Sequence, residues 1–187
     1  MLAFPPLDSL GPRICVCGPS NAGKSTLTWA IADKIGATPV SLDQLRFLPD
    51  TDWQLRPDAD FELLHEQAIA RERWIIEGNY MSLLPPRVAR ATGVILLGTD
   101  RWTAFGRYLR RTLFERQRHG HLAGAKDSLK WDMVSFILIE QPRKRQRDID
   151  LLRATGLPMV QVESMRELKA AYATWDLERS PVISPMA

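Results

Sequence analysis

One stretch near the start of the chain, residues 18–26, limits the possible folds more than any other feature. It has the spacing G-x-x-x-x-G-K-[ST], follows a short apolar run at 14–17 and precedes a segment with helical spacing of apolar residues. Glycines at both ends let the backbone wrap closely, so that consecutive N–H groups and a helix N-terminus face phosphate oxygens. This context favours a phosphate-binding P-loop over an ordinary glycine-rich turn. The expected phosphate-binding residues are Gly18, Pro19, Ser20, Asn21, Ala22, Gly23, Lys24, Ser25 and Thr26.

Two side chains of this loop have specific expected roles. Lys24 should reach the outer phosphates as a catalytic residue, and the Ser25 hydroxyl should contact Mg²⁺. The loop therefore predicts a bound nucleoside triphosphate with Mg²⁺. We take ATP as the nucleotide, although the loop alone does not separate ATP from GTP.

The length and composition predict one globular domain. The chain has 187 residues, of which 45% are hydrophobic and 25% charged, enough to bury a core. We expect a domain over 13–175, a flexible extension at 1–12 and a frayed tail at 176–187. No apolar run approaches membrane-spanning length and no basic signal-peptide region opens the chain. Cys15 and Cys17 should be buried thiols on one strand face, which fits a cytoplasmic setting.

Short apolar segments alternate with helical ones along the chain. The expected strands are 13–17, 38–42, 73–76, 93–97 and 159–162. The expected helices are 26–35, one opening at Pro57, 101–118, 128–140, 143–153 and 165–175. We expect an irregular loop at 44–56, another loop at Pro85 and Pro86, and a break at Pro142. The alternation predicts βαβ units and a parallel sheet covered on both faces.

Three carboxylates follow the ends of predicted strands: Asp43, Glu77 and Asp100. Ligands of such sheets bind beyond the carboxyl ends of the strands, so these groups should lie near the P-loop. Glu77 is a candidate for the metal shell, with a loop or cap carboxylate as the alternative. Asp43 is a candidate to contact Mg²⁺ waters or accept a proton from a hydroxyl, or else it caps the next turn.

Arginines concentrate in the predicted helix 101–118, which holds six of them against one acid, Glu115. We expect Trp102, Phe105, Leu109 and Leu113 to face inward. Arg107 and Arg111 are the first candidates to stabilise charge during phosphoryl transfer. Arg118, Arg143 and Arg147 are candidates for a mobile lid over the nucleotide, and for any single arginine the alternative is a solvated basic surface.

Several P-loop classes lack support in this sequence. No Asn-Lys-x-Asp motif for reading guanine is present, and neither Asn21 nor Asn79 begins one. The apolar run ending in Asp-Glu of helicases and related machines is also missing, since Glu77 is followed by Gly78. A small kinase-like domain is the remaining interpretation.

The sequence resembles a known family over about residues 13–175. The resemblance depends on the P-loop, on Ser41-Leu42-Asp43-Gln44-Leu45 with Pro49 and Trp53, on Trp74-Ile75-Ile76-Glu77-Gly78-Asn79-Tyr80, and on Arg101 with the arginine-rich helix. These strings are similar to adenylate-kinase-like proteins labelled DNA topology modulation (FlaR-related) proteins. The loop after Asp43 departs from the family pattern, so the identity of the acceptor is not carried over.

The resemblance implies a fold and a lid. The fold is the three-layer α/β P-loop NTPase fold of nucleoside-monophosphate kinases, with a five-stranded parallel sheet in the order 2-3-1-4-5. An arginine-bearing helical lid, here about 116–147, should lie between strands 4 and 5. In the wider group a carboxylate at the end of strand 3 helps to hold hydrated Mg²⁺, and Glu77 occupies that position.

The acceptor side is predicted around the ends of strands 2 and 3. Its candidate residues are Asp43, Arg46, Trp53, Gly78, Asn79 and Tyr80. Arg46 either binds an acceptor phosphate or is a surface loop residue, and Trp53 is a candidate to stack on a ligand ring. His65 should be structural, and His119 and His121 lack the further ligands that a metal site needs.

Two functions are compatible with these features. The favoured one is transfer of the γ-phosphoryl group of Mg·ATP to a nucleotide or another small hydroxyl or phosphate acceptor, by a monomer or homodimer. The alternative is a nucleotide-dependent DNA-binding regulatory protein, supported by the basic clusters at 101–118 and 143–147 and a pI of about 9.1. A steep salt dependence of DNA binding would favour the alternative.

Overall fold

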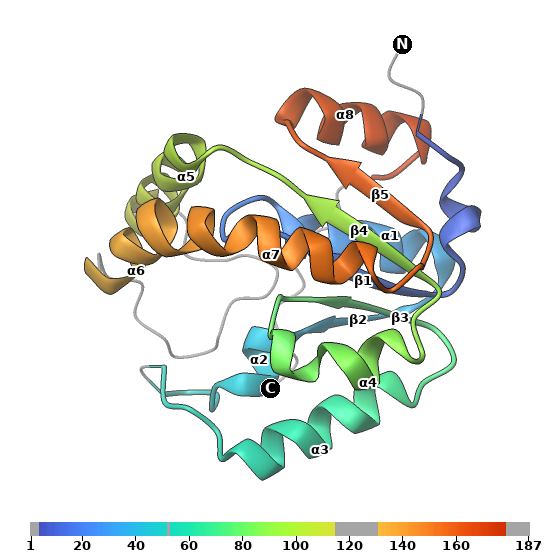
Figure 1. Cartoon of the computed structure of the whole chain (residues 1–187), viewed down its shortest axis with the longest axis horizontal. Coiled ribbons are helices and arrows are strands. Elements are labelled where there is room, and N and C mark those ends of the chain that lie inside the picture. Colours follow the sequence, from blue (N-terminus) through green and yellow to red (C-terminus); the bar gives the residue numbers. More distant parts are fainter. Residues whose placement is uncertain (1–3, 52, 115–130, 179–187) are drawn as a thin grey trace.

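The computed structural model describes residues 4–51, 53–114 and 131–178. Its centre is a sheet of five parallel strands in the order β2-β3-β1-β4-β5 (Figure 1). The predicted α/β fold class and strand order are therefore confirmed. The strands are β1 (Arg13–Cys17), β2 (Thr38–Ser41), β3 (Trp74–Glu77), β4 (Gly93–Leu97) and β5 (Met159–Val162).

Helices connect these strands and cover both faces of the sheet. They are η1 (Leu7–Leu10), α1 (Lys24–Ile35), α2 (Leu42–Arg46), α3 (Asp58–Ile69), η2 (Met81–Leu83), α4 (Leu84–Val88), α5 (Arg101–Phe114), α6 (Trp131–Ser135), the π-helical turn η3 (Phe136–Glu140), α7 (Gln141–Arg153) and α8 (Met165–Thr174). Among the described residues, none of the helices has both the length and the apolar character needed to cross a membrane.

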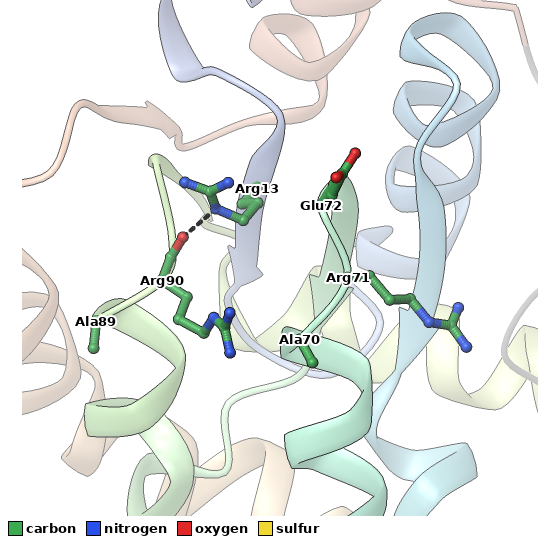
Figure 2. A pocket seen from close by; sticks show the side chains of 6 residues that line it. All are labelled: Arg13, Ala70, Arg71, Glu72, Ala89 and Arg90. Atoms are coloured by element: carbon green, nitrogen blue, oxygen red, sulfur yellow. Dashed lines mark hydrogen bonds between the residues drawn. The ribbon is translucent and has the colours of Figure 1, made fainter.

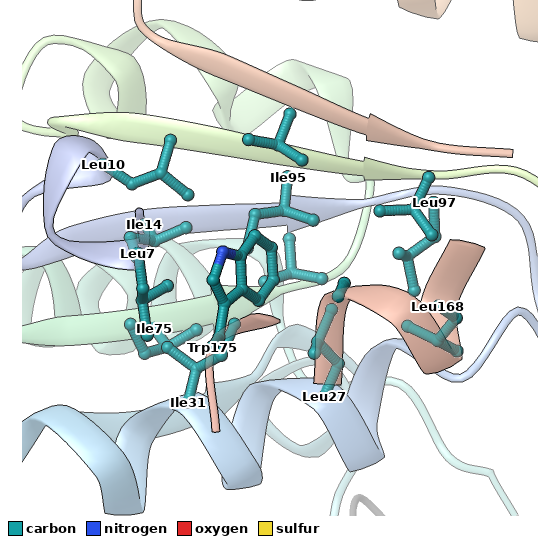
Figure 3. Close-up of a cluster of buried hydrophobic side chains, with 14 of the residues drawn as sticks. Leu7, Leu10, Ile14, Leu27, Ile31, Ile75, Ile95, Leu97, Leu168 and Trp175 are labelled. Atoms are coloured by element: carbon teal, nitrogen blue, oxygen red, sulfur yellow. The ribbon is translucent and has the colours of Figure 1, made fainter. Parts of the chain in front are cut away.

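The alternation of side chains along β1 explains the three layers. Ile14 and Val16 belong to a buried cluster with residues of α1, α8 and η1 (Figure 3). Cys15 and Cys17 point to the opposite face and pack with residues of α3, α4 and α7. Both cysteines are buried and free, as predicted, and burial raises the pKa of Cys15 to about 12.

The N-terminal segment differs from the expected loose extension. Leu7 and Leu10 lie one 3₁₀ turn apart in η1 and are both buried in the core. The indole N–H of Trp175 donates a hydrogen bond to the Pro5 carbonyl (2.9 Å), and the Phe4 ring packs 5.9 Å from Trp175. The described part of this segment is therefore a packed part of the domain.

A third cluster joins α5 to α6 and η3 through Ala104, Tyr108, Val134 and Ile137. The expectation that Trp102 faces inward is wrong, because Trp102 is 63% exposed to solvent and its ring lies 5.4 Å from the Arg101 guanidinium. Ala104 and Tyr108 are four residues apart and define the buried face of α5. This buried face of α5 packs against α6 and η3, and Trp102 is not part of that face.

The prolines do not break helices where the sequence suggested. Pro85 and Pro86 occupy the start of α4, and Pro142 lies at the start of α7. For Pro85 and Pro86 the reason is that the first N–H groups of a helix have no intrahelical partner. At Pro142 the π-helical turn η3 leads directly into α7, so residues 131–153 form continuous helix. The predicted irregular loop 44–56 instead begins with the end of α2 (Leu42–Arg46) and contains an antiparallel bridge between Phe47 and Leu55.

Candidate functional site

The phosphate-binding loop connects β1 to α1 at the carboxyl edge of the sheet. Gly18 has a φ of 140°, and a Cβ added there would meet the Leu97 carbonyl group of β4. Only glycine fits this position without strain. The loop ends at Gly23, and α1 begins at Lys24, so the free N–H groups of a 12-residue helix open toward the loop.

Two cations contact the loop backbone. The Lys24 ammonium donates a hydrogen bond to the Pro19 carbonyl (2.9 Å), and the Arg107 guanidinium donates one to the Asn21 carbonyl (3.0 Å). Asn21 has a positive φ of 61°. The structure therefore brings α5 against the phosphate loop through Arg107, one of the two arginines predicted to take part in transfer.

For the other arginines predicted to take part in the site, the structure describes no contact with the phosphate loop. Arg111 belongs to α5, but its side chain is outside the described part of the structure, as is the whole of Arg118 together with residues 116–130 of the predicted lid. Arg143 and Arg147 lie on α7 and are exposed. Their neighbour Arg145 forms an ion pair with Glu163, which directly follows β5.

Glu77 is the buried acid of the site. It ends β3, is 4% exposed, and its Oε1 accepts hydrogen bonds from Ser25 (3.0 Å) and Ser41 (2.8 Å). Burial raises the pKa of Glu77, which Lys24 and the two serine hydroxyls partly oppose. The strand register aligns Ser41 with Glu77, so β2 and β3 together deliver a carboxylate and a hydroxyl to the P-loop serine.

The loop after Glu77 connects the phosphate loop to Asp43 of α2. The Asn79 side-chain oxygen accepts a hydrogen bond from the Gly18 N–H (3.0 Å), and the Tyr80 hydroxyl donates one to Asp43 (2.7 Å). Gly78 has a φ of 124°, and a Cβ there would lie 2.9 Å from Leu42 Cβ. These contacts bring together four residues that the sequence predicted for the site.

A buried arginine holds this loop from below. Arg87 is 0% exposed and donates hydrogen bonds to the carbonyls of Gly78 (3.1 Å) and Asn79 (2.8 Å). The sequence analysis missed Arg87, because an arginine after two prolines has the pattern of an exposed loop. It also missed Ser41, although its position at a predicted strand end, two residues before Asp43, was a usable signal.

Asp43 and Arg46 both lie on the short helix α2. Asp43 is exposed beside Tyr80, whereas Arg46 forms an ion pair with Asp58 (2.6 Å) and lies 5.3 Å above the Phe61 ring. Trp53 is half-buried and packs edge-on against Phe47 at 5.2 Å. Asp100, predicted at the site edge, accepts hydrogen bonds from the Trp102 and Thr103 N–H groups and therefore acts as the N-terminal cap of α5.

The donor atoms fit Mg²⁺ held in part by phosphate and water. In the described ranges, no cluster of three or more His, Cys, Asp or Glu side chains is arranged to hold a metal ion. Mg²⁺ is usually bound by one or two protein oxygens together with substrate phosphates and waters. The Ser25 hydroxyl and the Glu77 carboxylate, 3.0 Å apart beside Lys24, are such oxygens.

A separate cavity of about 310 Å³ lies at the opposite, amino edge of the sheet (Figure 2). It is lined by Arg13, Ala70, Arg71, Glu72, Ala89 and Arg90. Arg13 donates a hydrogen bond to the Arg90 carbonyl, and Arg71 follows the C-terminal end of α3, where a cation is favourable. None of the predicted site residues lines this cavity.

Comparisons with known proteins support the fold. The sequence matches no known protein-family model and no curated protein sequence. The structure is similar to a shikimate kinase from Acinetobacter baumannii in complex with shikimate, with a TM-score of 0.54, 13% identity, and coverage of 90% of this chain and 96% of that one. It is also similar to a putative kinase from Chloroflexus aurantiacus, with a TM-score of 0.54, 16% identity, and coverage of 88% and 97%. At this identity the similarity shows a shared fold and nothing about the substrate.

Proposed function

We propose that this protein is a small phosphotransferase of the nucleoside-monophosphate-kinase type, which moves the γ-phosphoryl group of Mg·ATP to a small acceptor. The observation that carries the proposal is the meeting of Ser25 and the buried Glu77, 3.0 Å apart, next to Lys24 at the open edge of the phosphate loop. A simple nucleotide clamp needs the loop but does not need a buried acid at this position.

Each residue of the donor side has a role in this proposal. The loop N–H groups and Lys24 bind the phosphates, and Ser25 with Glu77 would hold Mg²⁺, which would supply positive charge to offset that of the phosphates. Arg107 moves from the Asn21 carbonyl to the transferring group, where it stabilises negative charge. Arg111, Arg118, Arg143 and Arg147 are the further arginines that we expect to close over the nucleotide.

The proposal includes the organisation of the chain. A single P-loop domain spans about residues 13–175 together with the packed N-terminal segment that holds η1, and the part between β4 and β5, about 116–147, acts as the lid. The family resemblance to DNA topology modulation proteins stays a part of this proposal, as does an adenylate-kinase-like use of ATP. The buried thiols of Cys15 and Cys17 fit a reducing, cytoplasmic location.

An acceptor screen with γ-labelled Mg·ATP tests the proposal. We expect label on at least one small acceptor, lowered to background by Lys24→Ala. The matched control is Lys34→Ala, since Lys34 lies at the other end of the same helix in an ion pair with Asp176 (2.7 Å), and it should leave transfer unchanged. If a broad panel of nucleosides, nucleotides, sugars and hydroxyacids gives no product above the Lys24→Ala background, the protein is not a kinase.

One observation favours a second candidate, DNA binding. Arg143, Lys144 and Arg147 are exposed on α7 and form a basic surface. Binding of duplex DNA whose affinity falls steeply with salt, and which is weakened by changing Arg143 and Arg147 to Gln, would support this candidate. Unchanged binding in that double variant would exclude α7 as the DNA contact.

A further inference from the structure

Ser41 is a buried polar residue of the site to which the proposed function gives no role. It is 2% exposed, ends β2 and immediately precedes α2. Its hydroxyl donates a hydrogen bond to Glu77 Oε1 at 2.8 Å. The strand register pairs Ser41 with Glu77 across β2 and β3, so the contact joins two neighbouring strands at their carboxyl ends.

Ser41 occupies the position at which a serine usually caps a helix. It is the residue before the first turn of α2 and has extended backbone angles (φ −98°, ψ 121°). At such a position the serine oxygen usually accepts a hydrogen bond from an N–H group of the first turn. Within the described residues 41–46, the Ser41 side chain makes no capping bond of this kind. Capping of α2 therefore does not account for this serine, and its partner is a carboxylate on another strand.

Two hydroxyl groups from different elements hold the same carboxylate oxygen. Ser25, in the first turn of α1, donates to Glu77 Oε1 at 3.0 Å, and Ser41 donates to the same oxygen from β2. A serine hydroxyl has one hydrogen and two lone pairs. Because the hydrogen of Ser25 is directed to Glu77, the lone pairs of its oxygen are left for a cation. The position of the Glu77 carboxylate therefore also sets the direction of the Ser25 hydroxyl.

The burial of Glu77 makes these partners necessary. Glu77 is 4% exposed, and a buried carboxylate needs hydrogen bonds or nearby opposite charge to offset the loss of water. Lys24 supplies a nearby positive charge, and Ser25 and Ser41 supply hydrogen bonds. The proposed function assigns Lys24 and Ser25 to the ligand as well. Of these three partners, Ser41 is the one whose contact is to Glu77 alone in that scheme.

We propose that Ser41 is a positioning residue, which holds the Glu77 carboxylate, and through it the Ser25 hydroxyl, in the orientation that binds Mg²⁺ together with ATP. The proposal rests on the Mg·ATP site of the proposed function. Ser41 acts through Glu77 in this role and does not contact the ligand. Removal of a group that orients a metal ligand typically lowers metal affinity by about 10–100-fold.

Binding of ATP with and without metal tests this role. We would measure the Kd of ATP by calorimetry in excess Mg²⁺ and in EDTA, and divide the EDTA value by the Mg²⁺ value to obtain the metal preference. We expect Ser41→Ala to lower the metal preference about tenfold or more, while the Kd in EDTA stays close to that of the wild type. General damage to the site would instead weaken binding in both solutions.

Thr92→Val is the matched control. The Thr92 hydroxyl also contacts a neighbouring strand, since it donates to the Arg13 carbonyl (3.0 Å) and accepts from the Arg13 N–H (2.9 Å). These bonds lie at the opposite, amino edge of the sheet, because Arg13 begins β1. Both variants should lower the free energy of unfolding in urea, but Thr92→Val should keep the metal preference of the wild type.

A double variant tests whether Ser41 acts through Glu77. Glu77→Gln should lower the metal preference at least as much as Ser41→Ala does. Adding Ser41→Ala to Glu77→Gln should then cause little further loss, since the effects of residues that act as one unit are not additive. Fully additive losses would mean that Ser41 acts by another route, which contradicts the proposal.

Two further results would overturn the role of Ser41. One is a wild-type metal preference in Ser41→Ala, which leaves the phosphotransferase proposal intact if the γ-phosphoryl group is still transferred. The other is a metal preference near one in the wild type, which also removes the metal role of Ser25 and Glu77. If the expected losses occur but the wild type phosphorylates no acceptor, Ser41 keeps its role in a Mg·ATP site and the phosphotransferase proposal fails.

Discussion

At the scale of single residues, the site depends on positions where one side chain alone fits. Gly18 is such a position, because its φ of 140° and the nearby Leu97 carbonyl exclude a Cβ. Glu77 is a different case, because its carboxylate is buried and accepts hydrogen bonds from two serine hydroxyls. At both positions the side chain is determined by a neighbour that is distant in sequence.

Gly18→Ala should abolish binding of Mg·ATP and destabilise the fold. The strained backbone costs about 1–3 kcal/mol, and the methyl group displaces β4 from the loop. Urea unfolding and nucleotide titration measure both effects. Gly106→Ala is the control, since nothing lies within 4 Å of a Cβ there in α5, and it should stabilise the protein by about 0.5–1 kcal/mol. Equal behaviour of the two variants would contradict the close packing at Gly18.

His65 should make the stability of the protein depend on pH. It is 1% exposed, and burial together with the nearby Arg87 charge lowers its pKa from 6.5 to about 4. The unfolded chain therefore binds a proton between pH 6.5 and 4 that the folded chain rejects, so stability is lost as the pH falls through this window. At about 1.4 kcal/mol per pKa unit, the loss reaches about 3 kcal/mol at pH 4.

Urea unfolding of the wild type and His65→Phe at pH 7.5, 6, 5 and 4 measures this dependence. Other groups titrate equally in both proteins, so the difference between them isolates His65. As the pH falls, the free energy of unfolding of the wild type should decrease relative to that of His65→Phe. A constant difference over this range would show that His65 is not held neutral.

At the scale of elements, the loop between β3 and α4 connects the two halves of the site. Asn79 contacts the phosphate loop, Tyr80 contacts Asp43, and Arg87 supports the loop beneath them. Because Arg87 is fully buried and bonds only to the backbone of this loop among the described contacts, it is a positioning residue. The pairing of β2 with β3 places Ser41 beside Glu77, where the Ser41 hydroxyl donates a hydrogen bond to the Glu77 carboxylate.

Arg87→Met should loosen this loop. The carbonyls of Gly78 and Asn79 would lose their donors, at a cost of about 2–4 kcal/mol in the free energy of unfolding. Amide hydrogen exchange at Gly18 should accelerate, since its acceptor Asn79 is no longer held. Arg90→Met, an exposed neighbour just past α4, is the control and should change the stability by less than about 0.5 kcal/mol. Unchanged exchange at Gly18 would separate Arg87 from the phosphate loop.

At the scale of the whole molecule, the parallel sheet gathers the site at one edge. The strand order places β1 between β3 and β4, so the P-loop lies between the loop after β3 on one side and α5 on the other. Helix α7 contacts the end of β5 through the Arg145–Glu163 pair. A ligand at this edge therefore touches segments that are distant in sequence.

Mg·ATP should stabilise the entire domain. At a concentration 100 times the Kd, the added stability is about 2.7 kcal/mol, which corresponds to a rise of about 5–10 °C in Tm for a chain of this size. Thermal unfolding with and without Mg·ATP measures the rise. It should be absent in Lys24→Ala and retained in Lys34→Ala, and a rise of equal size in both variants would place the nucleotide elsewhere.

The sequence by itself determined the phosphate loop, the strands, the fold class and, through family resemblance, the strand order. These follow from local signals: glycine spacing, short apolar runs and helical periodicity. It also identified Lys24, Glu77, Asp43 and Tyr80 as neighbours of one edge, because every parallel strand ends there.

Only the tertiary structure decided which partners the arginines bind and whether the prolines lie in loops or in helices. In the sequence, Arg46 and Arg87 cannot be distinguished from exposed surface arginines. In the structure, Arg46 pairs with Asp58, and Arg87 is buried beneath Gly78 and Asn79. Pro85 lies in the first turn of α4, and Pro142 lies where the π-helical turn η3 continues into α7. A side chain's partner is set by elements that meet only after folding, so the local pattern around these residues contained no signal for it.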